Sequence, residues 1–86
     1  MNNYFALRKA NRLRMQFVSG KSRAQIKEVI QYLCRVSWDL CGIELVRSDL
    51  IDMAIQANKE GQELFNVITD AETFVQEVKP SLRVLN

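Results

Sequence analysis

The segment Ser22–Gly42, SRAQIKEVIQYLCRVSWDLCG, decides the fold that the sequence predicts. Ser22 can cap a helix through its hydroxyl, and Gln25, three residues later, completes a Ser-x-x-Gln capping box. Gly42 readily takes the left-handed conformation that ends many helices. Apolar side chains between these signals fall within one helical sector of about 100°: Ile26, Val29, Ile30, Leu33, Leu40 and Cys41. We therefore expect a single amphipathic helix over 22–41, about five turns long.

A second helix is expected over residues 3–18, before the central one. Its apolar side chains share one narrow face: Ala6, Ala10, Leu13 and Phe17. Gly20 follows as a stop, and only Lys21 separates it from the cap at Ser22. Because the connection is so short, the two helices should be neighbours in space.

The segment after the central helix is less regular. Residues 43–47, IELVR, alternate as a short strand would, but a loop with tucked apolar side chains fits equally well. Ser48 then offers a cap for a third helix over 48–68. Gly61 could end this helix, but the apolar pattern resumes in phase beyond it, which favours a continuous helix. Such a helix would pair antiparallel with the central one as a hairpin.

A short fourth helix is expected over 70–79. Thr69 and Glu72 form a second capping box, and Pro80 stops the helix. The predicted fold is therefore an all-α bundle over residues 1–86, a single domain of three main helices and one short helix around a helical hairpin. Its expected core is Leu13, Phe17, Ile26, Val29, Ile30, Leu33, Leu40, Leu50, Met53, Ala57, Leu64, Phe65 and Phe74.

Size and composition are those of a small globular domain. The chain has 86 residues, of which 48% are hydrophobic and 26% charged. A chain of this length is marginally stable, so dimerisation would help it. There is no apolar run of about 20 residues for a membrane span, and the start MNNYFALRKANR has no apolar secretory signal. We therefore expect a cytoplasmic protein that does not contact a membrane.

The residue types argue against catalysis, a cofactor and a metal. The chain has no histidine, no glycine-rich phosphate loop, no Gly-x-Ser-x-Gly elbow and no Cys-x-x-Cys motif. Cys34 and Cys41 would lie about 10 Å apart along one helix, too far for a disulfide. Asp49 and Asp52 are expected to complement the dipole of a helix N-terminus. We therefore expect a non-enzymatic protein.

The charges are divided unequally along the chain. Residues 1–36 carry eight basic and one acidic side chain, a net charge of +7, whereas residues 37–86 carry four basic and nine acidic side chains, a net charge of −5. The basic half could meet an acidic partner such as nucleic acid. The residues that would contact phosphates are on the first predicted helix: Arg8, Lys9, Arg12 and Arg14.

The central helix carries a second patch outside its apolar stripe. Trp38 projects about 120° away from the stripe. Either the first helix or the C-terminal tail covers it within the chain, or it belongs to a partner-binding surface. The residues of this surface are Gln31, Cys34, Arg35 and Trp38. Tryptophan and arginine are enriched in binding hot spots. The leading hypothesis is a small regulator or adaptor that binds a protein partner or itself as a homodimer, and nucleic-acid binding is the alternative.

Overall fold

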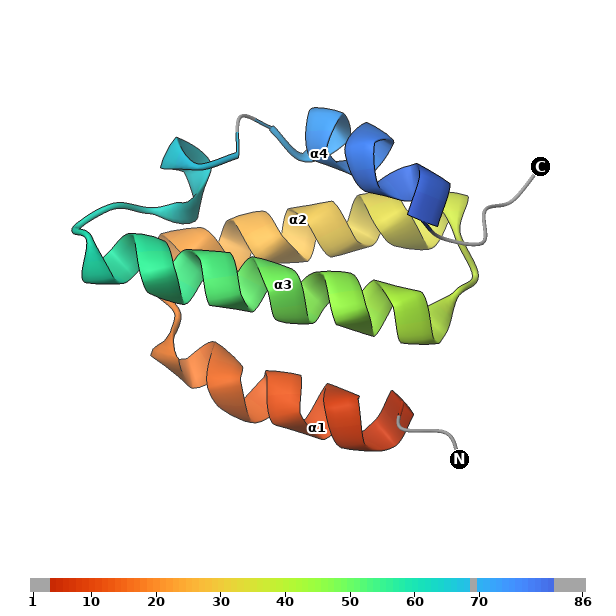
Figure 1. Ribbon diagram of the computed structural model, residues 1–86, viewed down its shortest axis with the longest axis horizontal. Coiled ribbons are helices and arrows are strands. Elements are labelled where there is room, and N and C mark those ends of the chain that lie inside the picture. Colours follow the sequence, from red (N-terminus) through yellow and green to blue (C-terminus); the bar gives the residue numbers. More distant parts are fainter. Residues whose placement is uncertain (1–3, 69, 82–86) are drawn as a thin grey trace.

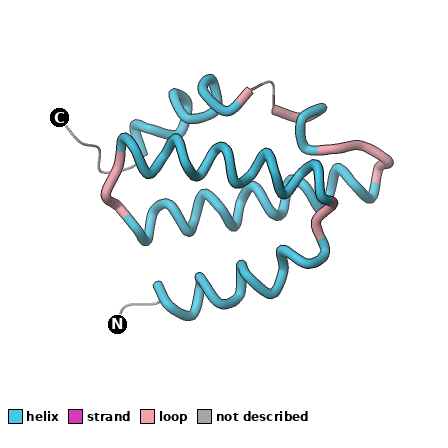
Figure 2. Tube along the Cα trace, turned by 180° about the vertical axis from the view of Figure 1, so that it is seen from behind, coloured by secondary structure: helices cyan, strands magenta, loops and turns pink. Residues whose placement is uncertain are grey.

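The computed structural model describes residues 4–68 and 70–81, and the regular elements of this part are helical (Figures 1 and 2). They are the α-helices α1 (Tyr4–Arg14), α2 (Gly20–Val36), α3 (Leu40–Lys59) and α4 (Ala71–Val78), with the short 3-10 segments η1 (Met15–Phe17), η2 (Leu64–Asn66) and η3 (Lys79–Ser81). The predicted all-α bundle is confirmed.

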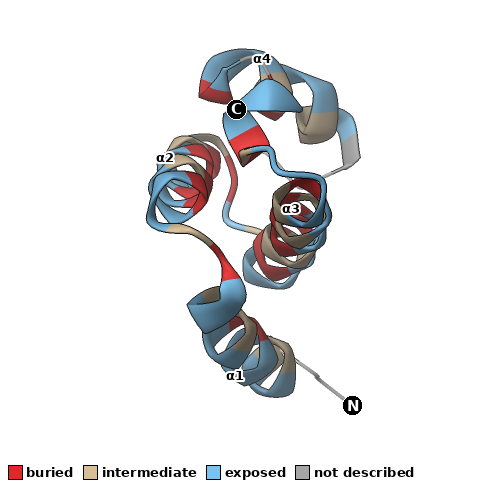
Figure 3. Ribbon diagram, turned by 90° about the vertical axis from the view of Figure 1, so that its left-hand side faces the viewer, coloured by how far each residue is buried: buried red, intermediate tan, exposed pale blue. Residues whose placement is uncertain are grey.

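The helices are arranged around the α2–α3 hairpin. Figure 1 shows α2 and α3 side by side and antiparallel, with α4 along one side of the pair and α1 along the other. The end view in Figure 3 places α4 and α1 on opposite sides of the hairpin. α4 packs mainly on α2, whereas α1 packs mainly on α3 and runs parallel to it. The expected helical hairpin is therefore the centre of the fold.

The core lies between α2, α3 and α4. Seven of the expected core residues are buried: Ile26, Val29, Ile30, Leu33, Leu50, Ala57 and Leu64. Met53 and Phe74 are partly buried against this cluster. Further buried apolar side chains, outside the predicted core, are Val18, Ile43, Val46, Ile51, Ala54, Ile68, Ala71 and Val75. Four of these eight residues lie on α3, which packs against α1, α2 and η2.

The central helix is shorter than predicted at its C-terminal end and longer at its N-terminal end. α2 ends at Val36, not at residue 41, because Asp39 caps a new helix by accepting a hydrogen bond from the Gly42 N–H at 3.0 Å. Its N-cap is Ser19, whose hydroxyl accepts from the Ser22 N–H at 3.2 Å. Ser22 therefore lies within the first turn, and Gly42 lies inside α3.

The third helix also has different limits from those predicted. Residues 43–47 form neither strand nor loop but the second turn of α3, and Ser48 lies in the middle of that helix. The expectation of a continuous helix over 48–68 is wrong, because α3 ends at Lys59. Gly61 has φ = 75°, a left-handed conformation that reverses the chain. Leu64 and Ile68 still reach the core, through η2 and the loop that follows it.

Gly61→Ala is expected to lower the free energy of unfolding by about 1 kcal/mol, because an L-residue pays for positive φ. The cost is conformational, since an added Cβ would meet no atom within 4 Å. Gly20 provides a matched control, because its Cβ would also meet nothing and its φ is not in the left-handed region. Urea unfolding followed by circular dichroism measures both variants. Equal effects of Gly61→Ala and Gly20→Ala would contradict the prediction.

The first helix is rotated relative to the prediction. Leu13 and Phe17 were expected in the core, but they are 56% and 71% exposed. Asn11, on the opposite side of α1, is buried against α3 instead. Leu40 and Phe65 are also exposed, at 57% and 48%. Leu40 is the first residue of α3, and in η2 it is Leu64, not Phe65, that is buried. The prediction that these four residues lie in the core is therefore wrong: Leu13, Phe17, Leu40 and Phe65.

The fourth helix agrees with the prediction in position but not in its cap. Asp70 caps α4 through its carboxylate, which accepts hydrogen bonds from the Thr73 N–H at 2.7 Å and the Thr73 hydroxyl at 3.0 Å. The expected capping residue, Thr69, lies outside the described residues. The pKa of Asp70 is lowered because these hydrogen bonds favour its ionised form.

Candidate functional site

A groove lies between α1 and α2 in the described part of the chain. α1 packs on α3 rather than on α2, so a space remains between α1 and α2. Two adjoining cavities of about 400 and 330 Å³ occupy this space, and both are lined by Met15, Arg23 and Arg47. We call the two together the α1–α2 groove.

Five cationic side chains from three helices line the α1–α2 groove: Arg8 and Arg12 from α1, Arg23 and Lys27 from α2, and Arg47 from α3. The described residues that line the two cavities include no acidic side chain. Because a recess concentrates the field of the charges around it, this groove should attract anions more strongly than an isolated surface arginine would. Guanidinium groups also present forked donors that suit carboxylates and phosphates.

One end of the groove is apolar. Met15, Ile26 and Ile30 line the smaller cavity together with Arg23, Lys27, Gln31 and Arg47. Ile26 and Ile30 are core residues, so the groove reaches down to the edge of the hydrophobic core there. The aliphatic stems of arginine and lysine can extend such a surface while their charged ends stay in water. The α1–α2 groove is therefore a cationic recess with an apolar strip beside it.

A buried polar contact fixes the position of α1 at the side of the groove. Asn11 is 1% exposed, and its Nδ2 donates hydrogen bonds to the backbone oxygen and to Oε1 of Glu44, both at 3.0 Å. Glu44 is 3% exposed, and its Oε2 lies 3.4 Å from Nη1 of Arg47. The Oδ1 atom of Asn11 has no protein partner. Asn11 and Glu44 thus connect a groove-lining arginine of α3 to the body of α1.

The four residues expected to bind nucleic acid do not lie together in the structure. Arg8 and Arg12 line the groove, whereas Lys9 is exposed on α1 outside it. Arg14 turns towards α3, where it donates to the Ser48 hydroxyl at 3.2 Å and forms an ion pair with Asp52. Asp49 and Asp52 lie in the middle of α3, so their expected role at a helix N-terminus is wrong.

Three groove cations were not selected from the sequence: Arg23, Lys27 and Arg47. Arg23 and Lys27 are four residues apart on one face of α2, so helical spacing could have identified them. Arg47 could not be placed beside the groove, because residues 43–47 were expected to form a strand or a loop. The convergence of the five cations depends on where α1 lies against α3.

The predicted surface around Trp38 does not form one helical face. Gln31, Cys34 and Arg35 are exposed on α2, but Trp38 lies beyond the end of that helix and is 56% exposed. The Arg35 guanidinium lies 5.6 Å from the centroid of the Tyr32 ring. Gln31 lies at the apolar end of the α1–α2 groove. Cys34 and Cys41 are free and exposed, and they lie on two different helices rather than one.

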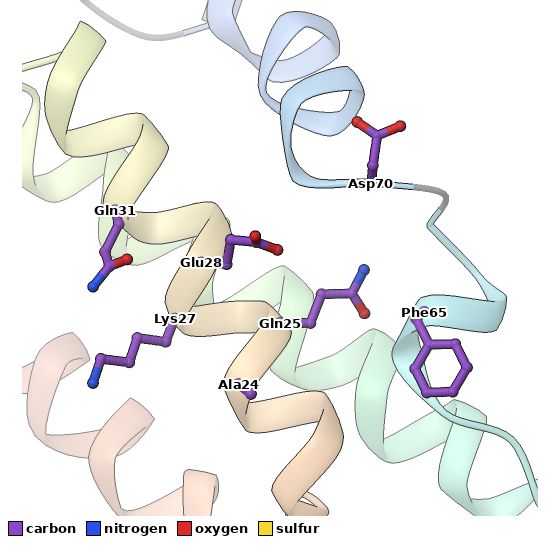
Figure 4. Close-up of a pocket in the computed structure, with 7 residues that line it drawn as sticks. All are labelled: Ala24, Gln25, Lys27, Glu28, Gln31, Phe65 and Asp70. Atoms are coloured by element: carbon purple, nitrogen blue, oxygen red, sulfur yellow. The ribbon is translucent and has the colours of Figure 1, made fainter.

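A second recess, between α2 and the start of α4, is broad and open (Figure 4). The side chains that line it are those of Ala24, Gln25, Lys27, Glu28, Gln31, Phe65 and Asp70. In Figure 4, Lys27 and Gln31 point to the opposite side of α2 from Gln25 and Glu28, and Asp70 points away from α2. Because the polar groups diverge, this recess is a poorer binding site than the α1–α2 groove.

Within the described residues, no group of three or more histidine, cysteine, aspartate or glutamate side chains could hold a metal ion. The lowered pKa of Glu63 belongs to a structural contact. Its carboxylate accepts hydrogen bonds from the hydroxyls of Ser19 and Ser22, and these bonds favour the ionised form. This contact joins the start of α2 to the loop after α3.

Glu63→Gln is expected to make the stability of the protein less dependent on pH. Because the folded-state pKa of Glu63 is lowered, its contribution is complete above the ordinary glutamate pKa of about 4.3 and is lost as the pH falls through the lower folded value. Thermal unfolding at neutral pH and at about pH 3 measures the difference. Glu77→Gln, at an exposed position on α4, should leave the wild-type difference unchanged.

None of the described helices combines the length and apolar character that crossing a membrane requires. A scan of protein-family models, a search of curated proteins and a search of solved structures each find no match to this chain.

Proposed function

We propose that this protein is a non-enzymatic binding module, a small regulator or adaptor, that takes an acidic amphipathic helix of a protein partner into the α1–α2 groove. The observation that carries the proposal is the convergence of five cations from three helices beside an apolar strip. We further propose a cytoplasmic location, because the two cysteines are exposed free thiols that a reducing compartment would preserve.

The two ends of the groove match the two sides of such a partner helix. Aliphatic side chains three or four residues apart on the partner would enter the 330 Å³ cavity beside Met15. Aspartate or glutamate side chains on its flank would then face Arg8, Arg12 and Arg23. The apolar contact would supply much of the affinity, and the charges would set the orientation and the association rate.

Nucleic-acid binding is the second candidate, and the arginines on both sides of the groove favour it. Arg8 and Arg12 on α1 could contact the phosphates of a strand that also passes Arg23 on α2. Such binding would depend steeply on salt, because each neutralised phosphate releases counterions. It would not require the apolar strip, which is why we rank the acidic helix first.

Arg8→Glu/Arg12→Glu is expected to weaken the binding of an acidic amphipathic peptide by about tenfold or more, because two attractive charge contacts become repulsive. Fluorescence anisotropy with the labelled peptide measures the change, and a scrambled peptide of the same composition should bind more weakly. Lys9→Glu/Lys59→Glu is the matched control, because it changes the net charge by the same amount and both lysines are exposed and do not line the groove.

Met15→Ser separates the two candidate partners. It shortens the apolar strip without changing any charge, so it should weaken the peptide and leave the affinity for duplex and single-stranded DNA unchanged. Binding of DNA in preference to the peptide, with a loss in Arg8→Glu/Arg12→Glu, would replace the first candidate by the second. If neither probe binds at low salt, both proposals are wrong.

A further inference from the structure

Asn11 offers an unused hydrogen-bond acceptor to the larger cavity of the α1–α2 groove, the one of about 400 Å³. Its Nδ2 donates to the backbone oxygen and to Oε1 of Glu44 on α3. Because both of these partners are acceptors, the orientation of the Asn11 amide is fixed with Nδ2 towards α3. Oδ1 is then the polar atom that the Asn11 side chain has left for the cavity it lines, and it has no hydrogen-bond partner among the described residues.

An acceptor buried in this way should favour a ligand that brings a donor. Asn11 is 1% exposed, and a buried oxygen without a donor lowers the stability of the folded chain. None of the four arginines that line the larger cavity donates to Oδ1. The donor can therefore come from a bound molecule, and the hydrogen bond would be made only when that molecule is present.

The larger cavity also favours negative charge. Arg8, Arg12, Arg23 and Arg47 line it, and one carboxylate, that of Glu44, lies 3.4 Å from Arg47. Four positive charges against one negative charge leave a net charge of +3 around the cavity. An oxyanion would replace repulsion between guanidinium groups by hydrogen bonds that match their forked donors. A ligand that suits the cavity therefore combines an oxyanion with an O–H donor.

We propose that the larger cavity binds a small phosphate that donates an O–H to Oδ1 of Asn11 and accepts hydrogen bonds from the surrounding guanidinium groups. Hydrogen phosphate has the anionic oxygens and the donor in one group, and a small phosphate ester can supply the donor from a hydroxyl of its own. Sulfate has the same shape and charge but no proton, so it would place a lone pair against Oδ1. The site does not depend on the acidic partner helix, because Asn11 and the arginines belong to this chain.

Titration of the isotope-labelled protein at about pH 8, followed by NMR spectroscopy, compares hydrogen phosphate with sulfate and methyl phosphate, which are dianions without an O–H at that pH. Sodium chloride keeps the ionic strength constant. We expect hydrogen phosphate to bind about tenfold more tightly than either, because only it satisfies the buried acceptor. The side-chain amide signals of Asn11 should shift on binding. Those of Asn66, in η2 and outside the cavity, should not.

Variants separate the hydrogen bond from the charge. Arg12→Gln/Arg23→Gln should weaken phosphate and sulfate by the same factor, because the guanidinium groups act on both anions, and the preference for phosphate should persist. Lys9→Gln/Lys59→Gln, with the same change of net charge outside the groove, should leave both affinities unchanged. Met15→Ser should weaken the acidic peptide but not phosphate, so a failure of this proposal can be distinguished from a failure of the proposed function.

Three outcomes would overturn the proposal. Equal affinities for hydrogen phosphate, sulfate and methyl phosphate would show that the cavity responds to charge alone. A preference for phosphate without a shift of the Asn11 amide would place the site elsewhere, and no binding up to about 10 mM would leave no site at all. Glycerol phosphate, a dianion with hydroxyl donors, identifies the source of the ligand: tighter binding than inorganic phosphate supports a hydroxylated phosphate ester, and weaker binding supports free phosphate.

Discussion

Ser22→Ala is expected to lower the free energy of unfolding by about 3 kcal/mol, although it removes a single oxygen atom. Ser22 is fully buried at the start of α2. Its hydroxyl donates to Oε1 of Glu63 at 2.9 Å and accepts from the backbone N–H of Leu64 at 3.0 Å. Leu64 is itself fully buried, so its N–H would lose its partner in a place that water reaches poorly.

The same hydroxyl joins two segments that are distant in the sequence. Glu63 also accepts a hydrogen bond from the Ser19 hydroxyl, so its carboxylate holds the first turn of α2 against the loop after α3. Ser22→Ala leaves the bond between Ser19 and Glu63 in place. The loss of stability should therefore come mainly from the unpaired N–H of Leu64 and from the lost hydrogen bond to Glu63.

Urea unfolding at neutral pH measures the effect of Ser22→Ala. The midpoint should fall while the m-value stays the same, because the folded state keeps its surface. Lys21→Ala, at the exposed neighbouring position, should change the stability by about 0.5 kcal/mol or less. A loss of under about 1 kcal/mol in Ser22→Ala would mean that Leu64 finds another hydrogen-bond partner.

The apolar pattern of α2 was sufficient to predict its buried face but not its ends. Ile26, Ile30 and Leu33 are buried as expected, because helical periodicity is a local property of the sequence. Both Ser19 and Ser22 can cap a helix, and the choice depends on Glu63, about forty residues away. The spacing of apolar residues along α2 does not reveal a tertiary contact of that kind.

The join between α2 and α3 was missed because the two helices meet nearly in phase. Leu40 and Cys41 continue the spacing of the α2 stripe, which concealed the break at Ser37 and Trp38. Asp39 was the available signal, since an aspartate with helix-compatible residues after it is a strong N-cap. Its recognition would have placed residues 43–47 in α3 and Arg47 beside the groove.

Only part of the candidate site could be predicted from the sequence. The basic residues of α1 could be grouped by spacing, which identified Arg8 and Arg12. Which side of α1 faces the hairpin could not be deduced, because a buried polar contact decides it against the apolar pattern. Asn11 pairs with Glu44, and the apolar face of α1 turns outward as a result.

Asn11→Ala is therefore expected to release α1 from α3 while α2, α3 and α4 keep their packing. Asn11 is the buried residue of α1, and its amide makes both hydrogen bonds to Glu44. The contacts of Arg14 with Ser48 and Asp52 are partly exposed and contribute less. A free helix of 11 residues is too short to be stable in water, so a released α1 should also unfold.

Hydrogen exchange followed by mass spectrometry measures this release. Amides of residues 4–14 should exchange about tenfold to a hundredfold faster in Asn11→Ala, which corresponds to about 1.4–2.8 kcal/mol, while those of residues 26–33 change much less. Gln16→Ala, at an exposed position, is the control. An equal increase in all helices would show that α1 unfolds only together with the hairpin.

Asn11→Ala also tests the proposed function. Arg8 and Arg12 remain in the chain of Asn11→Ala, so its net charge is unchanged, but the α1 side of the groove is no longer fixed. Affinity for the acidic peptide should then fall about as far as in Arg8→Glu/Arg12→Glu, because charges on an unfolded segment are not preorganised. If affinity persists after α1 is released, the cations of α2 and α3 bind the peptide without it, and the groove is not the recognition site.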